Sequence, residues 1–132
     1  MGDNSEKERR PVNFERLALQ SRVLAPGTRV FLKGIREQLE SKGVRISRIL
    51  DLGCAIGDET LLLAEYFPEA EIIAIDPMSE YIAHAQSRIS SQNIKFQTLR
   101  TCSPGLILRE ISDVDLIYCM FLMHSSDPQA YP

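Results

Sequence analysis

The chain has 132 residues, which is enough for one domain with a core of its own. It is 44% hydrophobic and 25% charged with a net charge of −3, as in soluble globular proteins, and it has no basic patch of the kind that binds nucleic acid. The longest nearly apolar run, 116–123, is too short to cross a bilayer, and the three cysteines lack metal-ligand spacing. We therefore expect a cytoplasmic protein without a metal, membrane or nucleic-acid partner.

Residues 1–43 are predicted to form a polar tail followed by a helical lead-in. The tail, 1–11, mixes charges of both signs and is expected to be disordered. In 12–43, apolar residues recur at helical spacing on both sides of Pro26-Gly27, which is a strong break signal. We predict one helix that ends before Pro26 and a second that is capped by Thr28. Gly43 is predicted to end the second helix in the left-handed conformation.

Residues 44–132 alternate short apolar runs with helical segments, and this predicts a parallel α/β sheet with right-handed crossovers. The last apolar run is nearly continuous, which is typical of a strand covered on both faces. Because no further strand follows it, we expect its edge to be a site of self-association. Strands are predicted at 48–53, 71–76, 93–99 and 114–120, and helices at 58–67, from a Ser79 cap onward, and around 106–110.

The segment 49–58 (Ile-Leu-Asp-Leu-Gly-Cys-Ala-Ile-Gly-Asp) is the most informative part of the chain. It predicts a buried strand that enters a turn with Gly53 and Gly57 and then begins a helix. Glycines allow a ligand to lie against the main chain, and the helix start offers N–H groups to it. The next strand ends in Asp76, where a carboxylate can hold two ribose hydroxyls. Together these features predict a site for a nucleoside cofactor.

The spacing of three motifs resembles that of the class I S-adenosylmethionine-dependent methyltransferases, in their small-molecule branch. The first motif of that family, an acid and then Gly-x-Gly-x-Gly, stands here as Asp51-x-Gly53-x-Ala55-x-Gly57, with Ala55 in place of a glycine. The acid that ends the second strand is Asp76, and a later Asp-Leu-Ile to Leu-x-His motif stands at 115–124. The resemblance covers 14–128. It implies a Rossmann-like sheet of order 3-2-1-4 with helices on both faces, in a methyltransferase domain (44–132) that lacks everything after the fourth strand.

The resemblance also implies the site: S-adenosylmethionine as cofactor and a small molecule as methyl acceptor. Gly53, Cys54 and Gly57 would cradle the methionine part of the cofactor, and Asp76 would bind its ribose. Asp51 would fix the turn by accepting backbone N–H bonds, and His124 is the candidate general base. His84 is expected on the surface, and Cys54 and Cys119 close together as small apolar side chains. The expected cofactor-binding residues are Asp51, Gly53, Cys54, Ala55, Gly57, Asp76, Pro77, Cys119, Met120 and Phe121.

Two alternatives to an active methyltransferase stay open. A nicotinamide dinucleotide would need Gly-x-Gly-x-x-Gly, but from Gly53 the later glycines would fall on Ala55 and Asp58, and the carboxylate of Asp58 would repel a pyrophosphate. The second alternative is a truncated, inactive fragment that binds the cofactor weakly or self-associates through the edge of the fourth strand. The feature in its favour is that the second half of the family fold is missing. The acid by which the family binds adenine after the third strand is also absent near Arg100 and Thr101, so adenine would be bound by backbone groups and apolar side chains or the cofactor would be bound weakly.

Overall fold

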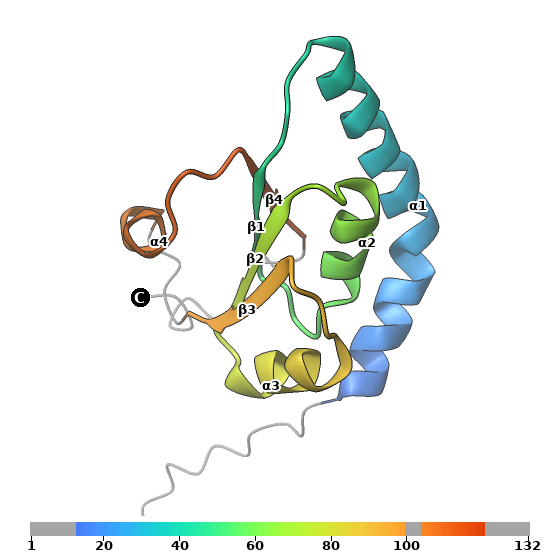
Figure 1. Cartoon of the computed structure of the whole chain (residues 1–132). Coiled ribbons are helices and arrows are strands. Elements are labelled where there is room, and N and C mark those ends of the chain that lie inside the picture. Colours follow the sequence, from blue (N-terminus) through green and yellow to red (C-terminus); the bar gives the residue numbers. More distant parts are fainter. Residues whose placement is uncertain (1–12, 100–103, 121–132) are drawn as a thin grey trace, which may run out of the picture.

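The computed structural model describes residues 13–99 and 104–120 (Figure 1). Its four strands form one parallel sheet of order β3-β2-β1-β4, which confirms the predicted fold class and strand order. No helix in the described part is long and apolar enough to cross a membrane. In chain order the elements are α1 (Phe14–Ser41), β1 (Arg48–Leu52), α2 (Asp58–Tyr66), β2 (Glu71–Asp76), α3 (Ser79–Arg88), β3 (Ile94–Thr98), α4 (Pro104–Glu110) and β4 (Leu116–Cys119).

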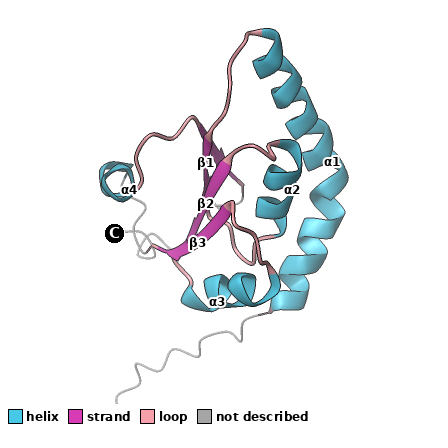
Figure 2. Cartoon of the chain, in the orientation of Figure 1, coloured by secondary structure: helices cyan, strands magenta, loops and turns pink. Residues whose placement is uncertain are grey.

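Two hydrophobic clusters lie on opposite faces of the sheet, as successive side chains of a strand point to opposite sides. On one face, Ile49 and Ile72 pack with buried side chains of α1 and α2, including Leu32 and Leu63. On the other face, Leu50 of β1 and Ile73 of β2 pack with Ile107 of α4 and with Ile111, which follows α4. Figure 2 shows α1 and α2 on one side of the strands and α4 on the other. The predicted helices on both faces are therefore confirmed.

The N-terminal region is one helix of 28 residues, so the predicted break at Pro26 is wrong. Pro26 lies inside α1 on its exposed side, where water can satisfy the Arg22 carbonyl that loses its donor. The buried stripe keeps its phase across the proline, because Thr28 and Leu32 continue it against the rest of the first cluster. Thr28 is consequently buried in the middle of the helix, and the N-cap is Asn13, whose side chain accepts from the N–H of Arg16.

The end of α1 agrees with the prediction. Gly43 has a φ of 65°, and its N–H donates to the carbonyl of Glu40 while the N–H of Val44 donates to that of Leu39. This pair of bonds is the glycine-dependent motif that ends many helices. The other predicted elements are all present, with ends that differ by a few residues.

Strand β4 differs from its prediction, because it is not covered on both faces. Leu116 and Tyr118 face the first cluster, whereas the Ile117 side chain is 55% exposed. Within the described ranges β4 pairs with β1 alone and lies at the edge of the sheet. The apolar run therefore marks an edge strand with one open face, a case that hydrophobicity alone does not separate from a fully buried strand.

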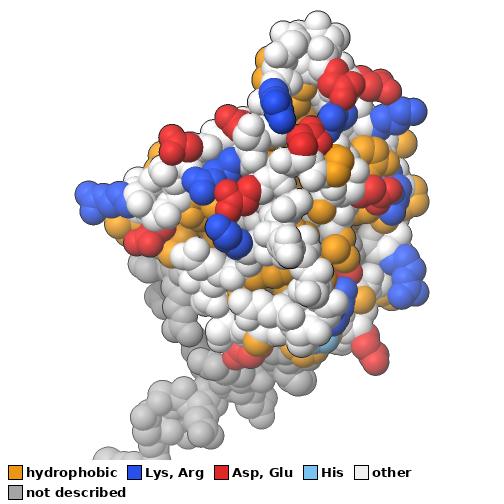
Figure 3. All heavy atoms as spheres, in the orientation of Figure 1, with side chains coloured by type: hydrophobic (Ala, Val, Ile, Leu, Met, Phe, Trp, Pro, Cys, Tyr) orange, Lys and Arg blue, Asp and Glu red, His pale blue; other side chains and the backbone are white. Residues whose placement is uncertain are grey.

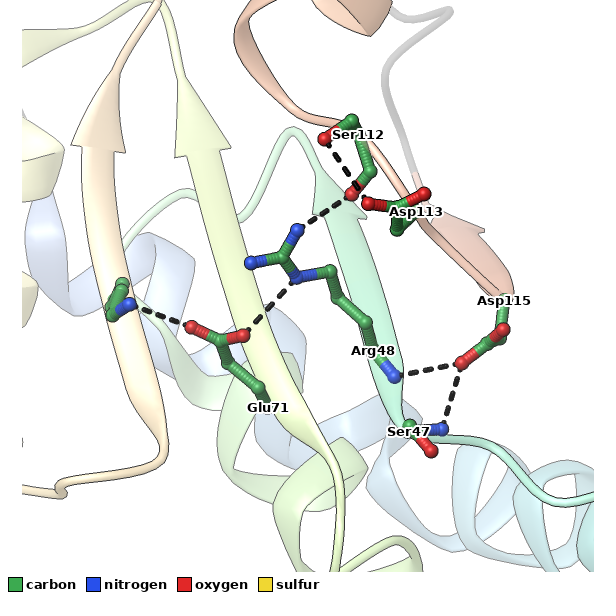
Figure 4. Close-up of polar contacts among 7 residues, drawn as sticks. Ser47, Arg48, Glu71, Ser112, Asp113 and Asp115 are labelled. Atoms are coloured by element: carbon green, nitrogen blue, oxygen red, sulfur yellow. Dashed lines mark hydrogen bonds and ion pairs between the residues drawn. The ribbon is translucent and has the colours of Figure 1, made fainter.

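Charged side chains cross the sheet at the edge where its strands begin (Figure 4). Arg48 contacts Glu71 of β2 at 3.1 Å and donates to the carbonyl of Ser112 at 2.6 Å. The Asp115 carboxylate accepts the N–H groups of Ser47 and Arg48, at 2.8 and 3.0 Å. These two bonds hold the pKa of Asp115 below its ordinary value. On the face shown in Figure 3, acidic and basic side chains are interspersed rather than gathered by sign.

Candidate cofactor site

The turn between β1 and α2 lies at the carboxyl edge of the sheet and is tied to the end of β2. The N–H groups of Gly53 and Cys54 both donate to the carbonyl of Ile75, at 2.9 and 3.0 Å. Gly53 has a φ of 79° and Ala55 a φ of 49°. Ala55 thus stands in a left-handed conformation that costs a side chain roughly 1–2 kcal/mol. This strain explains why a glycine is the typical residue at the position that Ala55 occupies.

Gly57 is required by packing as well as by its φ of 91°. A Cβ atom on Gly57 would lie 2.7 Å from Cδ1 of Ile89 and 3.1 Å from the ring of Phe96. The sequence led us to expect that the missing side chain makes room for a ligand. On this side of the turn, the space is already filled by Ile89, which follows α3, and by Phe96 of β3.

Asp76 joins the turn to the start of α3. Its side chain is 7% exposed, its Oδ2 accepts the N–H of Ala55, and its Oδ1 accepts the N–H of Met78, both at 2.9 Å. Burial raises the pKa of Asp76, and the two backbone bonds oppose this. Met78, not Ser79, is the residue that precedes α3, so the predicted Ser79 cap is wrong. The carboxylate supplies the local order that the serine was expected to give.

Asp51 joins β1 to α2 from inside the core. It is 2% exposed, and its Oδ2 accepts a hydrogen bond of 2.6 Å from the hydroxyl of Thr60, which is fully buried. Burial raises the pKa of Asp51 to about 7, and the bond from Thr60 opposes the shift. We expected backbone N–H donors here, whereas the bond that the structure shows comes from a side chain of α2. Sequence reasoning did not find Thr60.

The remaining predicted residues lie around this turn or outside the described ranges. Cys54 is buried against Ala74 and Ile82, and burial raises the pKa of its thiol. Cys119 is exposed, Pro77 and Met120 are half-buried, and Phe121 and His124 lie outside the described residues. His84, predicted at the surface, is half-buried there and stacks on Phe14 at 4.0 Å. Within the described part, no cluster of three His, Cys, Asp or Glu side chains could hold a metal ion.

Glu59 is a second residue that sequence reasoning missed. It lies in the first turn of α2 and accepts hydrogen bonds of 3.2 Å from the hydroxyls of Ser21 and Tyr118. Partial burial raises its pKa, and both bonds oppose that shift. The available signal was the polar residues Ser21 and Thr28 on the otherwise apolar stripe of α1, which need polar partners when they are covered.

The parallel sheet, the glycine turn after β1 and the acid after β2 define a Rossmann-like nucleotide-binding type of domain. A family model described as "methyltransferase domain" matches residues 49–131, more than half of the chain. The chain therefore belongs to the methyltransferase-domain family.

Curated relatives match shorter segments. Trans-aconitate 2-methyltransferase of Variovorax paradoxus is 33% identical over 58 residues, which are 44% of this chain and 22% of that protein. Malonyl-[acyl-carrier protein] O-methyltransferase of Acetivibrio thermocellus is 41% identical over 51 residues, 39% of this chain and 18% of that protein. The matched segment thus spans about a fifth of each of these relatives.

Solved structures share the fold. The N-terminal domain of EvdMO1 with SAH bound has a TM-score of 0.58 at 20% identity, over 72% of this chain and 38% of that chain. The SAM-bound CalS10, an amino pentose methyltransferase from Micromonospora echinaspora, has a TM-score of 0.55 at 18% identity, over 83% and 42% of the two chains. At these identities the likeness shows the architecture.

Proposed function

We propose that this chain binds S-adenosylmethionine at the carboxyl edge of its sheet, as the cofactor-binding part of an enzyme that methylates a small-molecule acceptor. The observation that carries the proposal is Asp76, a buried acid at the tip of β2 that is bonded to Ala55 in the neighbouring turn. Family membership and the names of the relatives support the reaction type. When bound, the cofactor supplies an electrophilic methyl group on a sulfonium.

The charges at this edge fit a cationic cofactor. Asp58, Glu59 and Asp76 lie in or beside the turn. One oxygen of Asp58 forms an ion pair with Arg88 at 3.0 Å, and its Oδ2 is buried with no hydrogen-bond partner among the described residues. S-adenosylmethionine carries a sulfonium and an ammonium, which such a field attracts. A dinucleotide pyrophosphate would meet repulsion at the same place. The acids therefore favour S-adenosylmethionine over a nicotinamide cofactor.

The chain's own residues would bind and orient the cofactor. Asp76 would accept bonds from the ribose, and Gly53, Cys54, Ala55 and Gly57 would form the floor under the methionine part. Pro77, Cys119 and Met120 would border the site, and Phe121 and His124 are kept as proposed contacts. Alignment of an acceptor with the sulfonium is the main requirement for methyl transfer to a good nucleophile.

Calorimetric titration with S-adenosylhomocysteine tests the proposal. We expect wild type to bind, and Asp76→Ala to bind about 10- to 150-fold more weakly through loss of a charge-assisted bond. Because Asp76 also accepts the N–H groups of Ala55 and Met78, and Asp76→Asn keeps an acceptor for only one of them, the thermal midpoint of each variant is measured beside its affinity to separate loss of loop order from loss of ribose binding. Glu71→Gln at the other end of β2 is the matched control and should bind as wild type does. Equal affinity of wild type and both Asp76 variants would refute the ribose assignment.

Within the described ranges β4 is an edge strand, and Ile117 is exposed on its open face. We infer that this edge is a self-association surface that can act beside cofactor binding. We also propose that the protein is cytoplasmic, because its three cysteines show neither a disulfide pattern nor a metal-binding pattern.

A further inference from the structure

One group of polar side chains joins three elements beside the proposed cofactor site. The Oε1 of Glu59 in α2 accepts from the hydroxyl of Ser21 in α1, and its Oε2 accepts from the hydroxyl of Tyr118 in β4. Each oxygen of the carboxylate thus holds a different element. Thr28 of α1, which is 4% exposed, interacts with both Glu59 and Tyr118.

This group lies at the edge where the cofactor would bind. Glu59 is two residues beyond Gly57, and Tyr118 pairs in register with Asp51 at the end of β1. The Tyr118 hydroxyl also lies 3.7 Å from the sulfur of Met120. Cys119 and Met120, which we expect to border the cofactor, directly follow the tyrosine. The position of Tyr118 therefore decides where the end of β4 stands relative to the turn.

The carboxylate of Glu59 is held by hydroxyls rather than by a cation. Ser21 and Thr28 face it from α1 and Tyr118 from β4, and the nearby ionisable groups are the acids Asp51 and Asp58. In the described ranges Glu59 forms no ion pair. A hydrogen bond to an ionised acceptor is stronger than one between neutral groups, so the negative charge itself holds the two hydroxyls.

We propose that Glu59 is a positioning residue for cofactor binding, which holds the end of β4 and the first half of α1 against the start of α2. The inference rests on the proposed function. Replacing Glu59 by Gln removes the negative charge and exchanges one acceptor oxygen for an NH₂ group, so that both charge-assisted bonds are lost and one of the two hydroxyls must turn from donor to acceptor.

A second contact between α1 and α2 supplies the matched control. Arg29 and Glu65 form an ion pair whose side chains are 43% and 52% exposed, about 1.7 helical turns along α2 from Glu59. Glu65→Gln should loosen the same pair of helices without touching Tyr118 or the end of β4. If Glu59 served helix packing alone, Glu59→Gln and Glu65→Gln would change the affinity for S-adenosylhomocysteine to the same extent.

The experiment measures the dissociation constant for S-adenosylhomocysteine and the thermal midpoint of wild type, Glu59→Gln, Tyr118→Phe and Glu65→Gln. We expect the first two variants to bind about 10-fold more weakly, corresponding to about 1.4 kcal/mol, and Glu65→Gln to bind as wild type does. The losses of affinity in the double variant Glu59→Gln/Tyr118→Phe should be less than the sum of those in the two single variants, because both changes weaken one shared bond. Tyr118→Phe keeps the test valid if Glu59→Gln does not fold.

A pH series gives a readout that packing alone would not move. As Glu59 takes up a proton, the affinity of wild type should fall toward that of Glu59→Gln, so the ratio of the two dissociation constants should approach one. A ratio that stays constant with pH, or an equal loss in Glu65→Gln, would overturn the inference. If wild type itself does not bind, the proposed function fails and this inference fails with it. If wild type binds and Glu59→Gln binds equally well, only the inference fails.

Discussion

The hydroxyl of Thr60 donates to the carboxylate of Asp51 across 2.6 Å, and both side chains are buried between β1 and α2. The pKa of Asp51 is raised from 3.8 to about 7 by burial. Between these two pH values the folded chain holds a proton that the unfolded chain has lost. The free energy of unfolding therefore falls as the pH rises through this window. The stability that the raised pKa of Asp51 contributes is fully present below about pH 4.

We accordingly expect Asp51→Asn to be more stable than wild type at pH 8, by at most about 4 kcal/mol, and equally stable near pH 4. Urea unfolding at both pH values measures the difference. Thr60→Val is the companion variant, which leaves the charge without its donor and should lower stability at pH 8. A difference between wild type and Asp51→Asn that does not change with pH would contradict the assigned shift.

Gly57→Ala is expected to destabilise the chain more than Gly43→Ala does. Both glycines have positive φ, but a Cβ on Gly43 meets nothing within 4 Å, whereas one on Gly57 meets Ile89 at 2.7 Å. Gly43→Ala should cost roughly 1–2 kcal/mol, the conformational part alone. The additional loss of stability in Gly57→Ala then measures the cost of the clash with Ile89. Adding Ile89→Ala to Gly57→Ala should recover part of that loss. Equal losses in urea unfolding would show that the contact relaxes freely.

Pro26→Ala is expected to stabilise the chain by about 1–3 kcal/mol, because it restores a donor to the Arg22 carbonyl inside α1. Thermal unfolding followed by circular dichroism measures both the midpoint and the helix content. Gly27→Ala, at the next position, should give a smaller gain of about 1 kcal/mol. A loss of stability in Pro26→Ala alone would mean that the packing of Thr28 and Leu32 needs the bend that proline imposes.

Ile117→Lys is expected to weaken self-association through the edge of β4, since a lysine on an open strand opposes pairing with another strand. Sedimentation equilibrium over a range of concentrations measures the effect. Val30→Lys is the control, because Val30 is 75% exposed on α1, away from the sheet edge. A wild-type chain that stays monomeric at high concentration would remove the edge from consideration.

The sheet could be predicted because its signals are local. The runs ending at Leu52 and Asp76 are apolar, bounded by turn residues and separated by one helix, which predicts parallel strands joined by a right-handed crossover. The order of the strands was implied by the resemblance to the methyltransferase family. The helix-breaking effect of Pro26 was overestimated. The apolar stripe of α1 stays in phase across the proline, and its burial against the rest of the core outweighs the local break signal. Thr60 and Glu59 were missed for a related reason. Their partners, Asp51 and Tyr118, are brought to them only by the packed fold.

The bonds from Asp115 to the N–H groups of Ser47 and Arg48 fix how a strand of only four residues is aligned with its neighbour (Figure 4). Side chains alternate along a strand, so a slip of one residue would turn Tyr118 outward and bring Ile117 against α2. The hydroxyl that Glu59 holds would then leave the carboxyl edge altogether. Asp115 lies three residues before Tyr118, or about 10 Å along the chain. Its carboxylate thus decides whether the Tyr118 hydroxyl is presented at the carboxyl edge.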